Sequence, residues 1–593
     1  MFLVTTADQR FWNTDEDILF LGEWCKIYDQ KDVWSKLNSK VLPYHWDDRN
    51  ILYNDYLYLD SIYERYLECL AKNLNELHNT NYSLNYWRIV VGPWLYYFIE
   101  ILYDRYLSLK TAYESGLVTN TWICKKDKNN WIPDDFEMFQ NWFCFDEYNF
   151  YLYSRIIEIL DIFPFDKLYV ERKPFNKIIS SVQDNRSYLY NIAKRFNLLY
   201  GWIIPDKLKK IVFVNSYLNN YDLINLQISL RQLPILCSPT TNYNDKVIFN
   251  SKLRKKITFH NHDSEFELLL NQLIPENMPK IFIENYNVSH EYSLRLYPNS
   301  PNIIFTSNSY LDAYFCLWAA YNKEKGTKLL GAQHGGHYGN GLWSASESHQ
   351  IKICDRYYSW GWHVKGESKV IPLPTGKFNI FKCNVKPNIN GNILWIGMTV
   401  PRYSYFLYSA SVGTHTLNYI DDQFRFYKFL SSQVNDILYL RLYPYDFGWN
   451  EKSRWVDKFP EIKINNVKLS LVESLNNSRL AICTYNATTY LETFVANFPT
   501  IVFWDPYYWE LRPSAQEYFD QLREVGIFHE TPESAAKMVN EIYKDPLSWW
   551  NKPEVQKAKD EFCYQFARTS DDWMKQWKNE FKKVLREMNT ELK

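Results

Sequence analysis

The amino-acid sequence predicts an α/β protein in which two parallel-sheet units follow a largely helical N-terminal region. Short apolar segments alternate with helical stretches from about residue 208 onwards, a pattern that indicates a parallel sheet. A second series of the same kind begins near residue 393. Between the two series, residues 372–392 carry three prolines, two glycines and several asparagines, a composition typical of a linker.

The N-terminal region, residues 1–205, is expected to be mainly helical. The segments 51–77 and 86–109 place apolar residues at three-to-four spacing with charged residues between them. Residues 3–6 form a short predicted strand. Thr14 precedes an Asp-Glu-Asp triplet, which we interpret as the cap and acidic first turn of a helix, in preference to a metal-binding DxD motif.

The two α/β units are defined by short apolar runs. In the first unit, strands are expected at residues 210–214, 280–283, 302–306 and 327–332, with helices at 264–273 and 309–324. In the second unit, strands are expected at residues 393–397, 437–442, 479–483 and 500–504, and the last 60 or so residues are expected to be helical. Because parallel sheets bind ligands beyond the carboxyl ends of their strands, motifs at those ends are the candidate functional groups.

Composition excludes several classes of protein. The 593 residues carry a net charge of −1, with 46% hydrophobic and 23% charged residues, so the chain offers no basic field for nucleic acid. Its ten cysteines form no CxxC pair, and neither a disulfide framework nor a metal site is expected. The most apolar stretch, residues 89–103, is shorter than the roughly 20 residues of a membrane span. We expect a soluble cytoplasmic protein, with peripheral contact with the inner membrane left open.

One motif, at residues 331–339, reads Gly-Ala-Gln-His-Gly-Gly-His-Tyr-Gly and directly follows a predicted strand. Its glycines let the backbone approach a ligand closely. Gln333 and His334 are therefore candidate catalytic residues, because a neutral histidine can take a proton from an acceptor hydroxyl or bond a phosphate. The alternative is a glycine-rich turn with a structural histidine.

Two further motifs follow strands of the second unit. Arg441 can contact a phosphate, and Pro444, after Tyr443, fixes a turn that presents backbone to a ligand; the alternative is a salt-bridged arginine before a turn. The segment 483–492 ends a strand and opens a helix near Asn486 or Thr488. Free amides and hydroxyls at a helix start bind anions, and Glu492, one turn further on, can accept hydrogen bonds from ribose; the alternative is a capped helix with an acidic first turn.

These motifs, with the Phe-Pro-Thr-Ile-Val-Phe segment at 498–503, resemble the donor half of GT-B glycosyltransferases, which have two Rossmann-like domains facing a cleft. Their order also resembles bacterial Kdo and other ulosonic acid transferases of capsule and lipopolysaccharide, which use a CMP-activated sugar. Those enzymes carry a His-Pro pair where this chain has Tyr443-Pro444, so the donor phosphate contact is expected to pass to Arg441 or His334.

Nearly the whole chain is similar to an uncharacterised bacterial transferase family of surface-polysaccharide gene clusters. The stretches that carry this resemblance are residues 5–12, 21–25, 43–49, 87–94 and the Gln-His-Gly-Gly loop. The first three of these stretches combine carboxylates and basic side chains with Trp12, Trp24 and Trp46. These side chains can orient an acceptor sugar by stacking and hydrogen bonding; the alternative is a buried ion-pair network. The candidate acceptor-binding residues are Asp8, Arg10, Glu23, His45 and Asp47.

The resemblance implies a metal-independent glycosyltransferase that moves a sugar, a CMP-activated ulosonic acid, from a nucleotide donor to a glycan or glycolipid acceptor, with no cofactor. It assigns residues 1–380 to the acceptor (206–380 Rossmann-like), 388–565 to the nucleotide sugar, and 566–593 to helices that cross back. The expected donor-site residues are Arg441, Tyr443, Pro444, Asn486, Thr488, Thr489 and Glu492. The alternatives are a CDP-glycerol or CDP-ribitol phosphate transferase and a non-catalytic glycan-binding or assembly protein.

Overall fold

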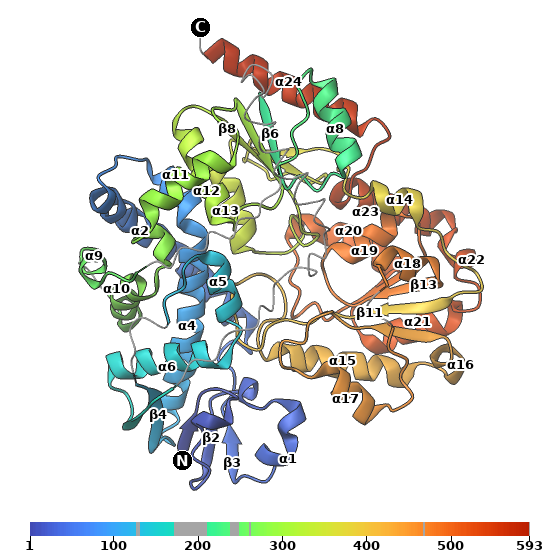
Figure 1. The fold of residues 1–593 in the computed structure, drawn as a ribbon. Helices are drawn as coiled ribbons and strands as arrows, with labels where there is room; N and C mark the ends of the chain where they lie inside the picture. Colours follow the sequence, from blue (N-terminus) through green and yellow to red (C-terminus); the bar gives the residue numbers. More distant parts are fainter. Residues whose placement is uncertain (126–130, 171–209, 238–247, 260–262, 466–468, 592–593) are drawn as a thin grey trace, which may run out of the picture.

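The computed structural model of the chain describes residues 1–125, 131–170, 210–237, 248–259, 263–465 and 469–591. Within these ranges the strands form three five-stranded sheets, and every strand pair in them is parallel. We call them the N-terminal, central and C-terminal sheets. The central and C-terminal sheets are the two predicted α/β units, so the predicted fold class is confirmed (Figure 1).

The N-terminal sheet is the main feature that the sequence did not predict. It consists of β1 (Phe2–Val4), β2 (Ile18–Phe20), β3 (Ser39–Val41), β4 (Asn120–Cys124) and β5 (Phe165–Leu168), in the order β3-β2-β1-β4-β5. Three of its strands, β3, β4 and β5, contain polar or charged residues, so they lack the continuous apolar run by which the other sheets were predicted. The strand expected near residues 3–6 is β1.

Helices make up most of the rest of this region. They are α1 (Lys31–Trp34), α2 (Arg49–His78), α3 (Leu84–Val90), α4 (Gly92–Glu114), α5 (Phe136–Trp142) and α6 (Asp146–Leu160). The expected helices at 51–77 and 86–109 correspond to α2 and to α3 with α4. The helix expected after Thr14 was wrong, because residues 14–16 form a turn in which Asn13 binds Glu16 at 2.8 Å. Residues 171–205 of the predicted helical region lie outside the described residues.

The central sheet follows the chain order. Its strands are β6 (Ile211–Val214), β7 (Ile303–Thr306), β8 (Lys328–Ala332), β9 (Arg356–Ser359) and β10 (Val370–Pro372). Its helices are α8 (Asn220–Ser229), α9 (Ser251–Arg254), α10 (Glu265–Asn277), α11 (Tyr286–Leu296), α12 (Ala313–Glu324) and α13 (Ala345–Ile353). The strand expected at 280–283 was wrong. This apolar run forms a 3-10 helix, Lys280–Phe282, whose amides bond the backbone of residues 133 and 134.

The C-terminal sheet reverses its strand order once. It contains β11 (Asn392–Ile396), β12 (Leu438–Arg441), β13 (Ser478–Cys483), β14 (Thr500–Phe503) and β15 (Phe528–His529), ordered β12-β11-β13-β14-β15. Its helices are α15 (His415–Phe429), α16 (Ser432–Asn435), α17 (Glu451–Lys458), α18 (Leu471–Asn476), α19 (Thr488–Val495), α20 (Pro513–Glu524), α21 (Pro532–Ile542), α22 (Pro546–Trp550) and α23 (Pro553–Phe566). The reversal lies between β11 and β13, where sheets of this type bind ligands.

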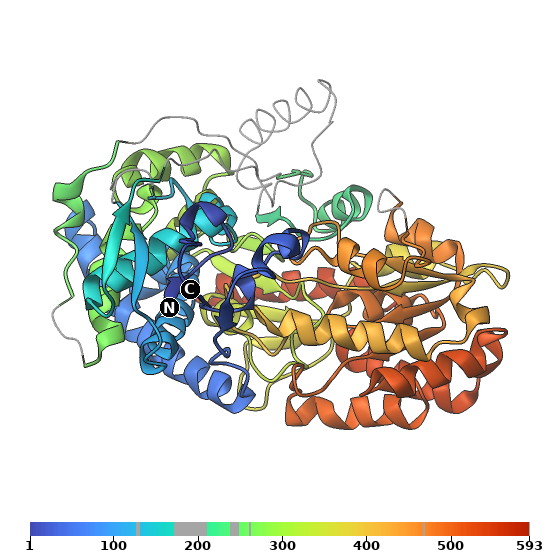
Figure 2. The same cartoon turned by 90° about the horizontal axis from the view of Figure 1, so that it is seen from below.

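The chain ends on the central sheet. Helix α24 (Trp573–Glu591) leaves the C-terminal lobe and packs against β6 and β7, with Phe581 at 5.3 Å from Phe213 and 5.5 Å from Phe305 between ring centroids. The linker between the sheets contains a short helix, α14 (Asn379–Asn384). Figure 2 shows the C-terminal lobe beside the other two sheets, so the linker and α24 join two adjacent bodies.

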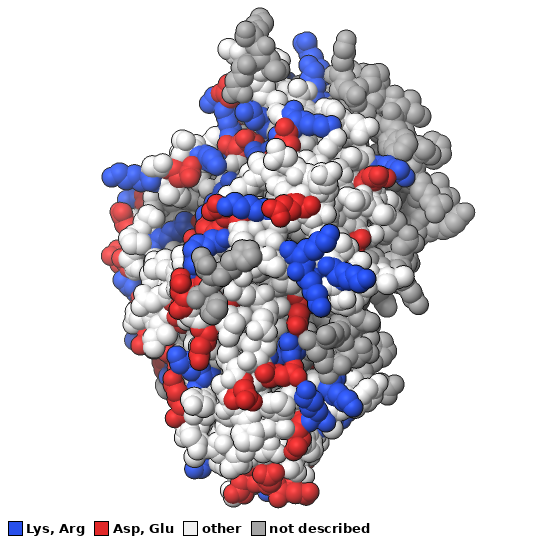
Figure 3. All heavy atoms as spheres, turned by 90° about the vertical axis from the view of Figure 1, so that its left-hand side faces the viewer, with Lys and Arg blue, Asp and Glu red and all other residues white. Residues whose placement is uncertain are grey.

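The distribution of charge on the surface and the hydropathy of the helices match the balanced composition of the sequence. On the face shown in Figure 3, acidic and basic side chains are interspersed and no broad patch of one sign covers it. Among the described residues, we find no helix with the length and hydropathy needed to cross a membrane.

Candidate functional site

The loop after β8 meets the loop after β13. The amide of Gly336 donates a hydrogen bond to Thr488 Oγ1 at 3.1 Å. A Cβ atom on Gly336 would lie 2.4 Å from the carbonyl oxygen of Ala487, so only glycine fits at this contact. The carboxyl ends of strands in the central and C-terminal sheets therefore face each other at this point, which is where ligands of such sheets bind.

Asn486 and Gln333 hold these loops in place. Asn486 donates to Asn340 Oδ1 at 2.9 Å and accepts from Tyr490 OH at 3.1 Å. Gln333 Oε1 accepts from the Trp360 amide and the Trp362 ring nitrogen, both at 2.8 Å. Both amide side chains are almost fully buried and bonded to protein groups, so the structure gives them a positioning role.

Helix α19 begins at Thr488 without a side-chain cap. The residue before it, Ala487, has an extended backbone and offers no oxygen to the first helical amides. Thr489 Oγ1 lies 2.8 Å from Tyr485 OH. An uncapped helix start leaves N–H groups that attract anions, and here it lies at the meeting point of the two loops.

Glu492, in the second turn of α19, and Lys377, in the loop after β10, lie close enough to interact electrostatically. Burial raises the pKa of Glu492 to about 7, and the charge of Lys377 opposes that rise. Burial likewise lowers the pKa of Lys377, whose Nζ donates to the carbonyl oxygen of His334 at 3.3 Å. In the described structure neither side chain forms an ion pair, with the other or with a third residue. Two half-buried, unpaired charges of opposite sign are poised for a polar ligand.

Sequence reasoning missed Lys377. It lies five residues after β10, in the segment interpreted only as a linker. Its ammonium lies about 5.0 Å from the ring centroids of Tyr217 and Trp360. The available signal was the Thr-Gly-Lys triplet at residues 375–377, but the strand before it, β10, was not predicted, so its place at the carboxyl end of a strand was not recognised.

His334 lies beside Lys377 and is half-buried. Burial and the nearby Lys377 charge lower the pKa of its imidazole to about 4, so the ring is neutral at pH 7. Its Nε2 lies 3.5 Å from Tyr338 OH, and Nδ1 has no hydrogen-bond partner among the described residues. His337, on the same loop, is also neutral, with a pKa of about 3 for the same reason of burial. A neutral imidazole can accept a proton, as the sequence suggested for His334.

Arg441 ends β12, two strands from β13, and donates to Ser474 Oγ at 3.1 Å. No carboxylate of the described residues pairs with it. Tyr443 and Pro444 line a cavity of about 380 Å³ at the same strand end, and the Tyr443 side chain is 46% exposed. The second motif thus forms a surface beside the C-terminal sheet that is separate from the contact made by Gly336.

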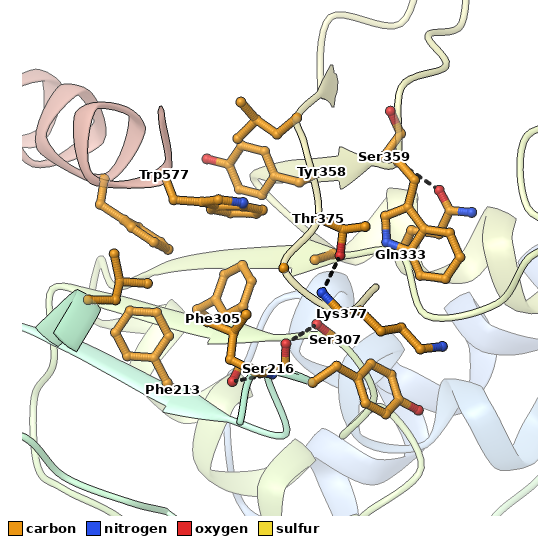
Figure 4. A pocket seen from close by; sticks show the side chains of 18 residues that line it. Phe213, Ser216, Phe305, Ser307, Gln333, Tyr358, Ser359, Thr375, Lys377 and Trp577 are labelled. Carbon is orange, nitrogen blue, oxygen red and sulfur yellow. Dashed lines mark hydrogen bonds between the residues drawn. The ribbon is translucent and has the colours of Figure 1, made fainter. Parts of the chain in front are cut away.

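A second cavity opens at the carboxyl edge of the central sheet (Figure 4). Aromatic side chains from β6, β7, β9 and α24 line one part of it: Phe213, Phe305, Tyr358 and Trp577. Polar side chains that follow β7, β8 and β10 line the other: Ser307, Gln333, Thr375 and Lys377. The four aromatic side chains are buried and pack in one hydrophobic cluster, so the cavity, of about 20 Å³, has room for little more than a water molecule.

The candidate acceptor residues lie beyond the carboxyl edge of the N-terminal sheet. Arg10 pairs with both Asp8 and Glu147. Glu23 pairs with Lys26 at 2.9 Å. The contacts of Arg10 with Asp8 and Glu147 favour the ion-pair alternative for Asp8 and Arg10.

His45 and Asp47 lie closer to the C-terminal lobe. His45 Nε2 is 3.5 Å from Asp104, and burial lowers the pKa of its ring to about 4. Asp47, with a largely exposed side chain, lies 3.6 Å from Nε2 of His415, the first residue of α15. These two residues therefore lie near the junction of the N-terminal region with the C-terminal lobe.

A long loop after β11, residues 397–414, covers the edge of the N-terminal sheet. Arg402 pairs with Asp146 at 2.8 Å and also donates to the carbonyl oxygen of Trp24. Further along, the Leu407 amide donates to Glu100 at 2.7 Å. The loop after the first strand of the C-terminal lobe is thus bonded directly to the N-terminal region.

Two Rossmann-like sheets with facing carboxyl edges, joined by a linker and by a final helix that returns to the first sheet, define a protein of the GT-B architecture. Residues 1–581 match the family model described as LIC12162 family transferase, and the chain belongs to that family. The full-length resemblance seen in the sequence is confirmed, and the protein is a transferase.

Solved structures give weaker similarities. HepE of Anabaena, in complex with UDP and glucose, is 10% identical with a TM-score of 0.34, covering 63% of this chain and 100% of its own. The S. aureus MnaA complex with UDP is 12% identical with a TM-score of 0.38, covering 64% and 97%. The wall teichoic acid polymerase TagF is 10% identical with a TM-score of 0.31, covering 68% and 97%. The search of curated proteins finds no match.

Proposed function

We propose that the protein is a glycosyltransferase that moves a sugar from a nucleotide donor to a glycan acceptor. The observation that carries this proposal is the pair of unpaired charges, Glu492 on α19 and Lys377 in the loop after β10, together with the uncapped start of α19. A nucleotide sugar supplies matching groups, namely an anionic phosphate and ribose hydroxyls. Family membership as a transferase supports group transfer at this place.

In this proposal the C-terminal lobe binds the donor. The amides at the start of α19, with the Thr488 and Thr489 hydroxyls, bind the phosphate, while Glu492 accepts hydrogen bonds from the ribose. Lys377 balances the negative charge that develops on the departing phosphate, and Arg441, at the end of β12, adds positive charge to the same edge of the C-terminal sheet. Fixed cations and dipoles suit that task, so the reaction as proposed requires no metal.

The acceptor is proposed to bind on the central-sheet side. The proposal has the acceptor sugar approach His334 and Lys377 at the carboxyl edge of the central sheet, and the contact of Lys377 with the His334 carbonyl oxygen, which brings these two residues together, supports it. Neutral His334 then takes the proton from the attacking acceptor hydroxyl. A surface glycan or glycolipid is the proposed acceptor, and peripheral contact with a membrane would follow from a lipid-linked one.

A CMP-activated ulosonic acid is the proposed donor. Such a donor carries two separate anions, one phosphate and one sugar carboxylate. The amides and hydroxyls at the α19 start and the Lys377 ammonium together offer enough donors for both anions.

A ligand-binding panel tests this proposal. CMP, CDP, UDP and inorganic phosphate are each titrated against the full chain by calorimetry, because binding to the folded state is measured directly. CMP binding that falls in Lys377→Ala and Glu492→Ala, and that is retained in the exposed-site control Glu524→Ala, is the expected result. Tighter binding of CDP would favour the glycerol or ribitol phosphate alternative. Glycan binding without any nucleotide binding would favour the non-catalytic one.

A further inference from the structure

A buried acid at the end of β12 is not used by the proposed transfer step. Glu451, the first residue of α17, is 7% exposed and lines the cavity of about 380 Å³ that Tyr443 and Pro444 also line. Its Oε1 atom is buried and has no hydrogen-bond partner among the residues that the structure describes. A buried carboxyl oxygen without a hydrogen-bond partner costs folding free energy unless a ligand donates a hydrogen bond to it or the group is protonated.

The cavity has the walls that a flat polar ring requires. Two tyrosines, Tyr443 and Tyr445, are 46% and 38% exposed and form part of its lining. Asn465 lines it too, and its backbone amide bonds the Leu440 carbonyl oxygen at 2.7 Å, which fixes it to the end of β12. Partly exposed aromatic faces beside fixed polar groups suit stacking and edge recognition of a heterocycle.

The position of the cavity relative to the α19 start also fits a nucleotide. In the C-terminal sheet β12 and β13 are the two neighbours of β11, so their ends are separated by two strand spacings, ~10 Å. This is comparable to the span of a nucleotide between its base and its phosphate. The strand order reverses between β11 and β13, so both ends flank the region where such sheets bind ligands.

We propose that this cavity is the nucleobase subsite of the donor and that Glu451 reads the base edge as a neutral carboxylic acid. The assignment rests on the proposed function, because it takes the phosphate to lie at the start of α19. A protonated carboxyl group offers one O–H donor next to one acceptor oxygen. Cytosine and uracil each present an acceptor beside a donor on their pairing edge, so one such acid forms two hydrogen bonds with either base.

Burial, with a smaller effect of the neighbouring groups, keeps the Glu451 carboxyl group neutral near pH 7. Burial is the main cause that raises its pKa to about 8, and Asp446, in the loop before α17, raises it further. The Thr399 hydroxyl, beside the Glu451 carboxyl group, and the charge of Arg454, on the same helix, lower its pKa in part. Tyr419 of α15 faces it as an uncharged phenol, and the exposed Lys452 lines the same cavity. The neutral acid therefore predominates below about pH 8 and the carboxylate above it.

The test compares nucleotides with and without a base. CMP, UMP and ribose 5-phosphate are titrated against the full chain at pH 7 and pH 9 by calorimetry, and the affinity ratio of CMP to ribose 5-phosphate measures base recognition. In Glu451→Ala this ratio should fall by about 10- to 30-fold, the loss expected for two neutral hydrogen bonds. Ribose 5-phosphate should bind unchanged.

Glu451→Gln separates recognition from folding. An amide keeps a donor beside an acceptor at every pH, so this variant should retain the ratio at pH 7 and show no fall at pH 9, whereas the ratio of the unaltered chain falls. Glu524→Gln, an exposed change in the same lobe, is the control. An unchanged ratio in Glu451→Ala, or a ratio independent of pH in the unaltered chain, would overturn the subsite. Failure of CMP and ribose 5-phosphate alike to bind would instead overturn the proposed function.

Discussion

Glu492→Gln is expected to make the protein more stable at pH 8 while weakening donor binding. Burial raises the pKa of Glu492 from 4.5 to about 7, so the folded state disfavours its charged form. The unfolded chain ionises near the ordinary value. The folding penalty is therefore absent below about pH 4.5, grows between about pH 4.5 and 7, and is complete above about pH 7.

The magnitude follows from the shift. A change of about 2.5 pKa units corresponds to about 3 kcal/mol at 1.36 kcal/mol per unit, as an upper value for a side chain that keeps some contact with solvent. Glutamine has the same shape without the charge, so it removes this penalty. If the C-terminal lobe unfolds as a unit of about 200 residues, each kcal/mol moves its melting temperature by roughly 2–4 °C.

Thermal melts at pH 5 and pH 8 measure this effect as a difference between the variant and the unaltered chain. The variant should melt several degrees higher at pH 8, and the difference should largely disappear at pH 5. Glu524→Gln, whose side chain is exposed on the same lobe, should change neither melt. Equal differences at the two pH values, or a variant that melts lower at pH 8, would refute the electrostatic reasoning about Glu492.

Two further predictions concern the meeting point of the loops. Lys377→Ala should weaken CMP binding by about 10-fold or more, because one charge-assisted hydrogen bond is lost, and Lys377→Arg should retain part of the affinity. Calorimetry measures both, with Lys428→Ala as an exposed control. Equal CMP affinities of Lys377→Ala and the unaltered chain would show that Lys377 does not contact the ligand. Gly336→Ala should lower the melting temperature and transfer activity, because its Cβ would lie 2.4 Å from Ala487 O. Gly397→Ala, whose Cβ meets nothing closer than 3.4 Å, is the control, and equal melts would contradict the close contact.

The sequence predicted the elements that show a continuous apolar run or a clear helical period. The strands at 211–214, 303–306 and 328–332, and those that begin the C-terminal lobe, are apolar runs between clear helical patterns, and they lie where expected. The N-terminal sheet was missed because β3, β4 and β5 contain polar or charged residues and therefore show no continuous apolar run. The run at 280–283 was misassigned because burial alone makes a short apolar segment look like a strand.

Some residues of the candidate site could be predicted from the sequence and others could not. Gln333, Asn486 and Thr488 were identifiable because they follow predicted strands, but their contacts depend on distant residues. Gln333 bonds residues 360 and 362, and Thr488 accepts from Gly336, 152 positions away. Lys377 was missed because its role depends on facing Glu492 across the two lobes, which no local pattern encodes.

The scaffold explains why Lys377 and Glu492 remain unpaired although they attract each other. Lys377 is held on the central-sheet side by its backbone bond to Thr375 at 3.1 Å and by its contact with the His334 carbonyl oxygen. Glu492 is fixed on α19, whose start is set by the Gly336 contact. The loop after β11, through Arg402 and its partners in the N-terminal region, resists relative movement of the two lobes.

Two charges that cannot relax toward each other cost folding free energy, and a ligand with an anion and hydroxyls recovers it on binding. This is the arrangement expected of a preorganised site, whose groups need not reorient during reaction. It also explains why a stabilising change such as Glu492→Gln should weaken function. If instead the lobes opened freely, Lys377 and Glu492 would pair or become solvated in the free protein, and the stability gain at pH 8 would vanish.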